Sequence, residues 1–481
     1  MKRAKNMSPD ARVPMMEKMA FALGGQGGNF YTMILSSFLL VYYTNVVGIG
    51  AGLIATIMGV SKALDGISDL AAGYILDRTH TKMGKCRPWL LRMIIPTGIC
   101  MLLMFYVPAG MDGFLRVAYI FVTYNLTNTV CLTMVSVAHA ALNGSMSINQ
   151  KDRGLNGGLM MLFGIAGGLI LNSTVLQITT AVGGGDPYTQ KGWTVMLLIY
   201  TAVYAILTLF CVFGTTERVT LMKQGEQEGN GNSEKNEKKS EVKVLEALKI
   251  LIHDKYWVIF VVVMLCVTSP SSGMANVYFA QYILDDVLLY TPLANFTSIG
   301  ALSGAVLSLI MMTKMKKRNI CMTGLLATVI GSIIPAFTHI LPLLYLSAVL
   351  KGVGAGFAMC VLPGMLQDTI SYAQWQSGKD VLGMGNAAYS FANKLGGSFG
   401  TIVFGWMLDA SGFNGKLAVQ PGSAITTINM LYVWIPTILT AIGIVCMYFY
   451  DLDNIFDKIA ADLKERIMGK DQKATAAETE E

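Results

Sequence analysis

The feature that most constrains this chain is a series of apolar stretches separated by short polar joints. About 20 consecutive apolar residues are enough to cross the hydrocarbon core of a bilayer as an α-helix. A transmembrane β-barrel would not give continuous apolar runs of that length, because its strands alternate between lipid and lumen. The sequence therefore predicts an all-α polytopic membrane protein.

Twelve stretches of this kind can be counted, which predicts twelve transmembrane helices. They lie at about 21–46, 52–76, 89–108, 116–142, 155–182, 193–214, 256–283, 291–313, 320–338, 341–366, 381–410 and 428–450.

Composition supports this class and argues against an enzyme. Of the 481 residues, 53% are hydrophobic and 14% are charged, whereas soluble domains have about 25% charged residues. The spans contain no cluster of His, Cys and Asp that would suggest catalysis, and the eight cysteines form no CxxC pair. We therefore expect no cofactor and read the cysteines within the spans as small buried hydrophobic residues.

Lys and Arg are distributed unevenly over the joints. The joint at 77–92 contains five of them and the joint at 314–319 contains four, whereas the joint at 47–51 contains none. The positive-inside rule then places both termini in the cytoplasm. The first twenty residues are polar and basic, so we expect no cleavable signal peptide. The expected location is the inner (plasma) membrane of a bacterium.

A long polar interval divides the spans into six and six. Residues 215–255 are rich in Gly, Asn, Glu and Lys, which predicts a cytoplasmic linker. It separates an N-terminal six-helix bundle at 1–214 from a second six-helix bundle at 256–450, and a cytoplasmic tail follows at 451–481. Both strongly basic joints fall between the second and third spans of their half, which favours an internal repeat with parallel halves.

The second span contains two carboxylates, Asp65 and Asp69, with Lys62 three residues before the first. Residues four apart lie on one face of a helix, so the two carboxylates are stacked one turn apart. Carboxylates inside a membrane are unfavourable unless they meet a cation, a proton or a basic partner. Two interpretations remain open, namely a structural ion pair between helices and a coupling-cation site of a transporter.

The polar joint after the second span has its own pattern. Gly73 permits close helix packing, and Asp77 at the membrane edge can pair with basic groups or cap a helix N-terminus. Arg78, Lys85 and Arg87 supply the basic groups. These residues are candidates for a cytoplasmic gate, and a merely solvated joint is the alternative.

Spaced motifs over essentially the whole chain resemble one known family. They are Tyr42-Tyr-Thr-Asn-Val-Val-Gly-Ile49, Lys62 to Asp69, Arg78-Thr with Gly84-Lys-Cys-Arg-Pro-Trp89, Ser371-Tyr-Ala-Gln-Trp375-Gln-Ser-Gly378 and Asn393-Lys394. In this order they resemble the glycoside–pentoside–hexuronide:cation symporters, the melibiose permease-like branch of the major facilitator superfamily. The resemblance implies a major facilitator fold and alternating-access symport of a small polar solute, expected to be a glycoside or other carbohydrate, with Na⁺ or H⁺.

The resemblance also implies a cation site on the second and fourth helices. The matching positions are Asp65, Ser68, Asp69 and Thr133, an oxygen set suited to Na⁺ in which the two carboxylates are the charged ligands. Lys394 in the eleventh span matches an intramembrane lysine of the family and is the expected charge partner of the acidic pair, together with Lys62.

The solute positions match the family less well. The melibiose branch uses carboxylates on the first and fourth helices and an arginine on the fifth, and the corresponding residues here are Asn29, Ser136 and Met161. Trp375 is a further solute candidate because aromatic rings stack on sugars, with an interfacial anchor as the alternative. A lipid or amphiphile carrier of the same fold and a non-transporting membrane sensor are the other functions considered.

Overall fold

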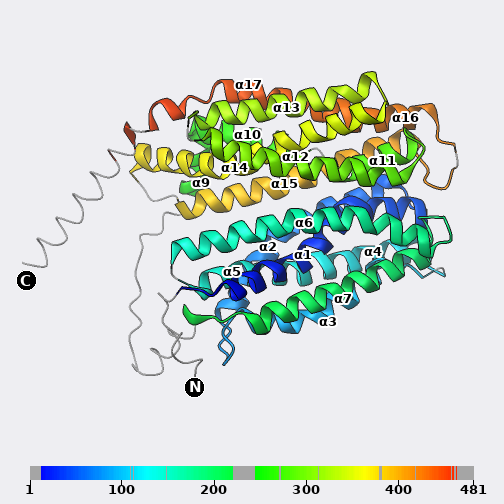
Figure 1. Cartoon of the computed structure of the whole chain (residues 1–481), viewed down its shortest axis with the longest axis horizontal. Coiled ribbons are helices and arrows are strands. Elements are labelled where there is room, and N and C mark those ends of the chain that lie inside the picture. The colour runs from blue at the N-terminus through cyan, green and yellow to red at the C-terminus, as the bar shows by residue number, and fades with distance from the viewer. Residues whose placement is uncertain are drawn as a thin grey trace, which may run out of the picture. The chain divides into compact units, whose positions relative to one another are not determined.

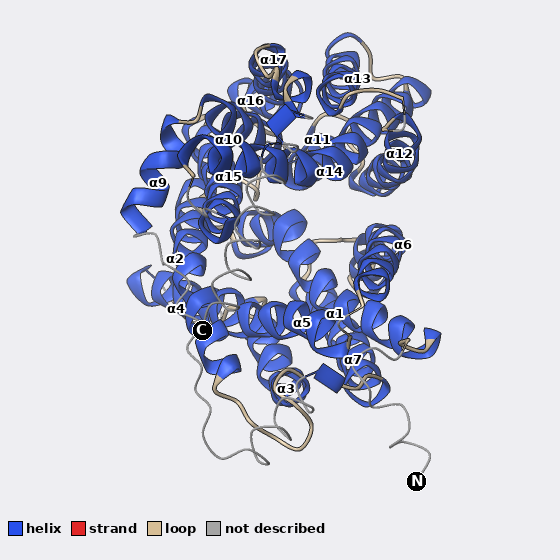
Figure 2. Cartoon of the chain, turned by 90° about the vertical axis from the view of Figure 1, so that its left-hand side faces the viewer, coloured by secondary structure: helices blue, strands red, loops and turns tan. Residues whose placement is uncertain are grey.

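The computed structural model describes residues 12–219, 244–269, 272–378, 382–456, 458–459 and 462, apart from the single residues 109, 112, 148, 313 and 418. Every regular element within these ranges is a helix, as Figures 1 and 2 show. The all-α prediction is confirmed.

The elements of the first half run in chain order from α1 to α7. They are α1 (Met15–Val41), η2 (Tyr42–Val47), α2 (Ala51–Asp77), α3 (Arg87–Met104), α4 (Gly113–Asn125), η3 (Leu126–Leu132), α5 (Thr133–Met146), α6 (Gln150–Val182) and α7 (Gln190–Gly214).

The second half begins at α9, close to the short apolar segment that precedes the seventh predicted span. Its elements are α9 (Val244–His253), α10 (Lys255–Thr268), α11 (Ser272–Tyr282), η4 (Val287–Leu289), α12 (Tyr290–Met311), α13 (Lys317–Phe337), α14 (Leu341–Ser377), α15 (Leu382–Ala410), α16 (Gly422–Asn429), η5 (Met430–Trp434), α17 (Ile435–Tyr448) and η6 (Leu452–Asn454).

The helices accommodate the twelve predicted membrane passages. Within the described residues, ten helical stretches, several of them made of consecutive elements, are long and apolar enough to cross a membrane. Helices α2 and α15 have 27 and 29 residues, which also exceeds the ~20 residues that a crossing requires. These two helices carry the charged side chains singled out above, which lowers their mean hydropathy.

The described residues group into two units by their contacts, and each has its own apolar core. The first unit comprises residues within 1–236, 271–295 and 401–429, and the second comprises those within 237–270, 296–400 and 430–481. In the first, α1 packs between α6 and α7 (Figure 1). In the second, α13 packs on α14, and α10 packs on α17. The boundaries of the two six-helix bundles remain a prediction from the sequence, because the bundles follow the order of the helices along the chain, whereas these units follow contacts between helices.

In both units, a carboxylate that follows one helix accepts hydrogen bonds from backbone N–H groups at the start of another helix. In the first, Glu217 follows α7 and accepts hydrogen bonds of 2.8–2.9 Å from three backbone N–H groups at the start of α3. In the second, Asp453 follows α17 and accepts one of 2.8 Å from the backbone N–H of Arg318 at the start of α13. A carboxylate is favourable at both places because the first N–H groups of a helix have no partner within the helix. The shared arrangement supports the predicted internal repeat.

Asp254 joins α9 to α10 and gives the second unit a pH-sensitive position. Its Oδ1 accepts a hydrogen bond of 2.9 Å from the Tyr256 backbone N–H, and its Oδ2 is buried without a hydrogen-bond partner in the described residues. Burial raises the pKa of this carboxyl from 3.8 to about 6. The folded state therefore binds the proton more tightly than the unfolded state does. The contribution of this group to the free energy of unfolding is complete below pH ~4 and is lost as the pH rises through ~6.

We expect Asp254→Asn to flatten this pH dependence, because Asn keeps the helix cap without titrating. At 1.36 kcal/mol per pKa unit, the wild type should lose roughly 3 kcal/mol of folding free energy between pH 4 and 7 through this group. Melting temperatures of the purified protein in detergent, measured across that range for both proteins, check the prediction. Parallel curves would contradict it.

Candidate functional site

Asp65 on α2 is held by the neighbouring passage formed by α4, η3 and α5. Its Oδ2 accepts a hydrogen bond of 2.8 Å from Asn128 Nδ2, and its Oδ1 accepts one of 2.8 Å from Thr129 Oγ1. Both donors lie in η3, which is a π-helix. Two neutral donors thus fix the carboxylate in position, and the ammonium group of Lys62 on the same helix also interacts with it electrostatically.

The structure brings two further predicted oxygens to this place. Ser68 Oγ and Thr133 Oγ1 are 3.4 Å apart, and Ser68 also donates to the backbone carbonyl of Asp65 at 2.9 Å. Asp69 lies one helical turn beyond Asp65 and is partly buried. Carboxylate and hydroxyl oxygens are the ligands that hard cations prefer. The arrangement can therefore hold a small hard cation or a proton.

The sequence reasoning missed Asn128 and Thr129, and the reason is geometric. A π-helix has an i→i+5 hydrogen-bond pattern and contains one residue more per turn than the 3.6-residue repeat assumes. Thr133 Oγ1 accordingly lies 3.3 Å from the carbonyl oxygen of Asn128, five residues earlier. The available signal was the concentration of polar residues in this span, from Thr123 to Thr133, in which the pair Asn128 and Thr129 lies.

The two predicted lysine partners differ in what the structure records. Lys62 Nζ is 3.5 Å from Thr401 Oγ1, within the first unit. Lys394 lies on α15 within the second unit, where its backbone carbonyl accepts a hydrogen bond of 2.8 Å from Ser398. Its pairing with the acidic residues stays a prediction.

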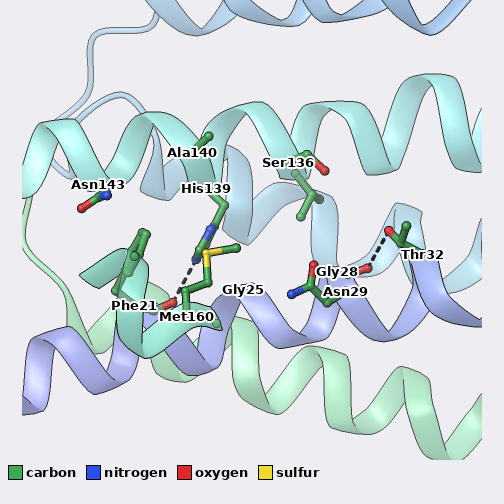
Figure 3. A pocket seen from close by; sticks show the side chains of 13 residues that line it. Phe21, Gly25, Gly28, Asn29, Thr32, Ser136, His139, Ala140, Asn143 and Met160 are labelled. Carbon is green, nitrogen blue, oxygen red and sulfur yellow. Dashed lines mark hydrogen bonds between the residues drawn. The ribbon is translucent and has the colours of Figure 1, made fainter. Parts of the chain in front are cut away.

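A cavity of about 390 Å³ lies inside the first unit between α1, α5 and α6 (Figure 3). Asn29 on α1 and Ser136 on α5 both line it, so two of the three predicted solute residues meet at one place, whereas Trp375 does not line this cavity. Met160 lines the cavity next to the position that was aligned with the family arginine. The remaining lining residues are Phe21, Gly24, Gly25, Gly28, Thr32, Val135, His139, Ala140, Asn143 and Gly157.

The glycines of α1 explain why there is room for His139. A Cβ at Gly25 would lie 2.8 Å from His139 Cε1, closer than real Cβ atoms approach other atoms. His139 stacks on Phe21 with ring centroids 4.4 Å apart and an angle of 14° between the rings. A backbone without side chains on this face of α1 thus admits the imidazole of α5.

The gate residues form local contacts around the joint after α2. Lys85 Nζ and Asp77 Oδ1 form an ion pair at 2.7 Å, and the Arg78 guanidinium lies 4.3 Å above the centre of the Tyr74 ring. Arg87 Nε donates to the Val212 carbonyl at 2.7 Å. A Cβ at Gly73 would meet no atom of the described residues within 4 Å. The close packing for which Gly73 was singled out is therefore not formed here, and the role of these residues as a gate stays a prediction.

Trp375 lies on α14 in the second unit. Its indole N–H donates to Asp462 Oδ2 at 3.1 Å, and its ring lies 6.0 Å from that of Tyr372. These contacts fix the ring against the chain that follows the last span. Its predicted role in solute binding is not tested by them.

The Tyr42–Asn45 motif joins helix ends at the side opposite the basic joints. Both tyrosine hydroxyls bond to backbone carbonyls at the end of α3. The threonine hydroxyl shares a hydrogen bond of 2.9 Å with the Tyr278 hydroxyl, and the asparagine amide donates to Tyr282 at 2.9 Å. This motif, which carries part of the family resemblance, thus ties the end of α1 to α11 within the first unit.

Small residues let α15 approach α2 at the same side. A Cβ at Gly405 would lie 2.1 Å from Ala55 Cβ and 2.7 Å from the Ala51 carbonyl oxygen. The end of α15 and the start of α2 are therefore in close contact within the first unit. Deeper in the same unit, at the start of α11, a Cβ at Gly273 would lie 2.7 Å from Ser37 Oγ of α1.

Comparison with known proteins identifies relatives over nearly the full length. A family model described as "MFS/sugar transport protein" matches residues 20–454. The isoprimeverose transporter of Lactiplantibacillus pentosus is 27% identical over 460 residues, which cover 94% of this chain and 92% of that protein. The putative glycoside/cation symporter YagG of Escherichia coli (strain K12) is 27% identical over 458 residues, covering 92% of this chain and 93% of that protein.

Solved structures agree on the fold. The crystal structure of a D-xylose-proton symporter matches with a TM-score of 0.64 at 16% identity, covering 91% of this chain and 97% of that one. At this identity the likeness establishes the fold alone. The predicted arrangement of twelve helices in a major facilitator fold is confirmed.

Proposed function

Because the chain belongs to the MFS/sugar transport protein family and is a membrane transporter rather than an enzyme, we propose that it carries a glycoside or related carbohydrate together with a coupling cation. The observation that carries this proposal is the position of the two sites on one helical passage. Asn128 and Thr129 hydrogen-bond to Asp65 of α2. Thr133 contacts Ser68, and Ser136 follows one turn later in the cavity.

The cation is proposed to bind at Asp65 and Asp69 with the hydroxyls of Ser68 and Thr133. Asn128 and Thr129 would orient the first carboxylate, and Lys394 would act as charge partner when the cation is absent. Cation binding neutralises the acidic pair and so favours the solute-loaded state. By linkage, the solute then tightens cation binding by the same factor.

We further propose that the protein lies in a bacterial inner membrane with both termini in the cytoplasm. The basic joints that follow α2 and α12 support this orientation. An amphiphile carrier fits less well, because amide and hydroxyl side chains such as Asn29, Ser136 and Asn143 line the cavity. These groups suit a solute with many hydroxyls.

A solute-uptake screen in proteoliposomes tests the function itself. Imposed Na⁺ and H⁺ gradients should be supplied separately, with a panel of neutral glycosides as solutes. Accumulation that collapses when one gradient is removed identifies the coupling ion. Binding of sugars without any transport would instead favour a sensor.

Asn29→Ala and Ser136→Ala are expected to weaken solute binding more than cation binding. Loss of one hydrogen bond to a solute hydroxyl should raise the solute dissociation constant roughly three- to tenfold. Calorimetry with solute and with Na⁺ on each purified variant separates the two effects. Thr180→Ala is a suitable control, because that hydroxyl donates to the Leu176 carbonyl within its own helix. Unchanged solute affinity in both variants would show that this cavity is not the solute site.

A further inference from the structure

We propose that His139 is a solute-binding residue that accepts a hydrogen bond from a hydroxyl, and that the cavity it lines selects uncharged carbohydrates. This inference rests on the proposed transport function and specifies the solute. It starts from the imidazole of His139, for which the sequence favours a packing or hydrogen-bonding role over a ligand role because no second histidine lies near it. In Figure 3, His139 projects from α5 toward α1.

The hydrogen bonding of the ring determines its tautomer. His139 Nε2 lies 2.9 Å from the carbonyl oxygen of Phe21. A carbonyl oxygen can only accept, so Nε2 carries the proton. In the neutral ring, Nδ1 is then an acceptor with a lone pair. Nδ1 of His139 is therefore a hydrogen-bond acceptor and cannot act as a donor.

This acceptor has no partner within the described part of the chain. His139 is 6% exposed and lines the cavity, and its recorded contacts are the Phe21 carbonyl and the Phe21 ring. The stacked ring and the Nε2 hydrogen bond prevent the imidazole from turning toward another partner. Nδ1 is not one of the fully enclosed polar atoms that lack a partner, so it is accessible from the cavity, where a ligand that donates a hydrogen bond can pair with it. A sugar hydroxyl is such a donor.

The charge of the lining restricts the solute further. None of the thirteen described lining residues carries a carboxylate, an ammonium or a guanidinium group. An anionic sugar placed here would lose its water without gaining a counter-charge, which is strongly unfavourable. A neutral glycoside can instead satisfy its hydroxyls with Asn29, Ser136, Asn143 and His139. The cavity is therefore expected to discriminate against uronides and sulfonates.

Two substitutions separate binding from packing. In His139→Gln, the side-chain amide reaches the place of Nε2 and can keep the Phe21 contact, but the acceptor at Nδ1 is gone. In His139→Asn, the shorter amide lies near Nδ1 and can replace the acceptor, but the Phe21 contact is gone. We expect His139→Gln to lower the affinity for a neutral glycoside by about five- to tenfold with Na⁺ affinity unchanged, and His139→Asn to keep more solute affinity but melt at lower temperature.

The probes are isoprimeverose as the neutral disaccharide and methyl β-glucuronide as the anionic sugar, measured by calorimetry and by uptake into proteoliposomes. Protection of wild-type His139 from diethyl pyrocarbonate by the neutral sugar, read by mass spectrometry, needs no variant, because the reagent attacks a nitrogen lone pair. His253→Gln, on the exposed face of α9, is the matched control.

The outcomes are distinguishable. Higher solute affinity in His139→Gln than in His139→Asn, or no protection by a sugar that the wild type transports, overturns the role of His139 and leaves the transport function standing. Equal or better binding of the glucuronide overturns the neutral selectivity. Failure of the wild type to transport any sugar of a wider panel overturns the proposed function and this inference with it.

Discussion

Gly405→Leu is expected to reduce solute accumulation by roughly five- to 150-fold while the protein still folds and binds solute. The reason is the approach of α15 to α2, where even a Cβ at this position would lie 2.1 Å from Ala55 Cβ. Overpacking of this kind costs about 1–3 kcal/mol. A free energy of this size shifts the equilibrium between the closed and open forms by roughly five- to 150-fold. Since these helix ends must part and close again in alternating access, the substitution should trap the open form.

The measurement is labelling of a cysteine introduced at Ser37 of α1, which faces Gly273 deeper in the same unit, below these helix ends. In the Gly405→Leu background, a membrane-impermeant maleimide should react with this cysteine faster than in the parent. Gly422→Leu is the matched control, because a Cβ at that glycine meets no atom within 4 Å. If labelling and uptake match those of the parent, the helix ends do not act as a gate.

Asp69→Asn should abolish cation-driven accumulation and leave the protein folded. The substitution keeps the shape of the side chain but removes one of the two charges that a cation would neutralise. Asp65 would remain in place, since its hydrogen bonds come from Asn128 and Thr129. Solute exchange between equal concentrations, which needs no gradient, should persist and so distinguishes lost coupling from lost transport.

Uptake driven by Na⁺ and by H⁺ gradients, followed in parallel with exchange, checks this expectation. Asp285→Asn is a suitable control, because that residue lies in the loop between α11 and η4. Accumulation at the level of the parent protein in Asp69→Asn would remove the acidic pair from the coupling mechanism.

The sequence was sufficient for the features that follow from helical periodicity and composition. The apolar runs predicted the membrane class and the helices, and the four-residue spacing placed Asp65 and Asp69 on one face. The family resemblance predicted that Ser68 and Thr133 share one site and that Asn29 and Ser136 share another. In the structure the first two are in contact and the other two line one cavity.

What the sequence did not provide depends on departures from a regular helix and on contacts between distant segments. Asn128 and Thr129 reach Asp65 through a π-helix that no 3.6-residue pattern anticipates. The importance of His139 arises from its contact with Phe21, 118 residues earlier in the chain. A neighbouring helix was expected to pack closely against Gly73. A glycine alone does not indicate in which conformational state of the transporter that contact forms.

The π-helix η3 has a consequence for how such a protein can change during evolution. It lies within one continuous passage, Gly113–Met146, with the donors to Asp65 inside it and Ser136 and His139 after it. Because a π-turn takes up one extra residue, deleting one residue from η3 would restore a regular α-helix and leave the segments on either side facing as they do now. The same deletion in a regular stretch of α5 would turn every later residue by about 100°. The π-helix is thus the place in this passage where a single-residue deletion alters the donors to Asp65 while Ser136 and His139 keep facing the cavity.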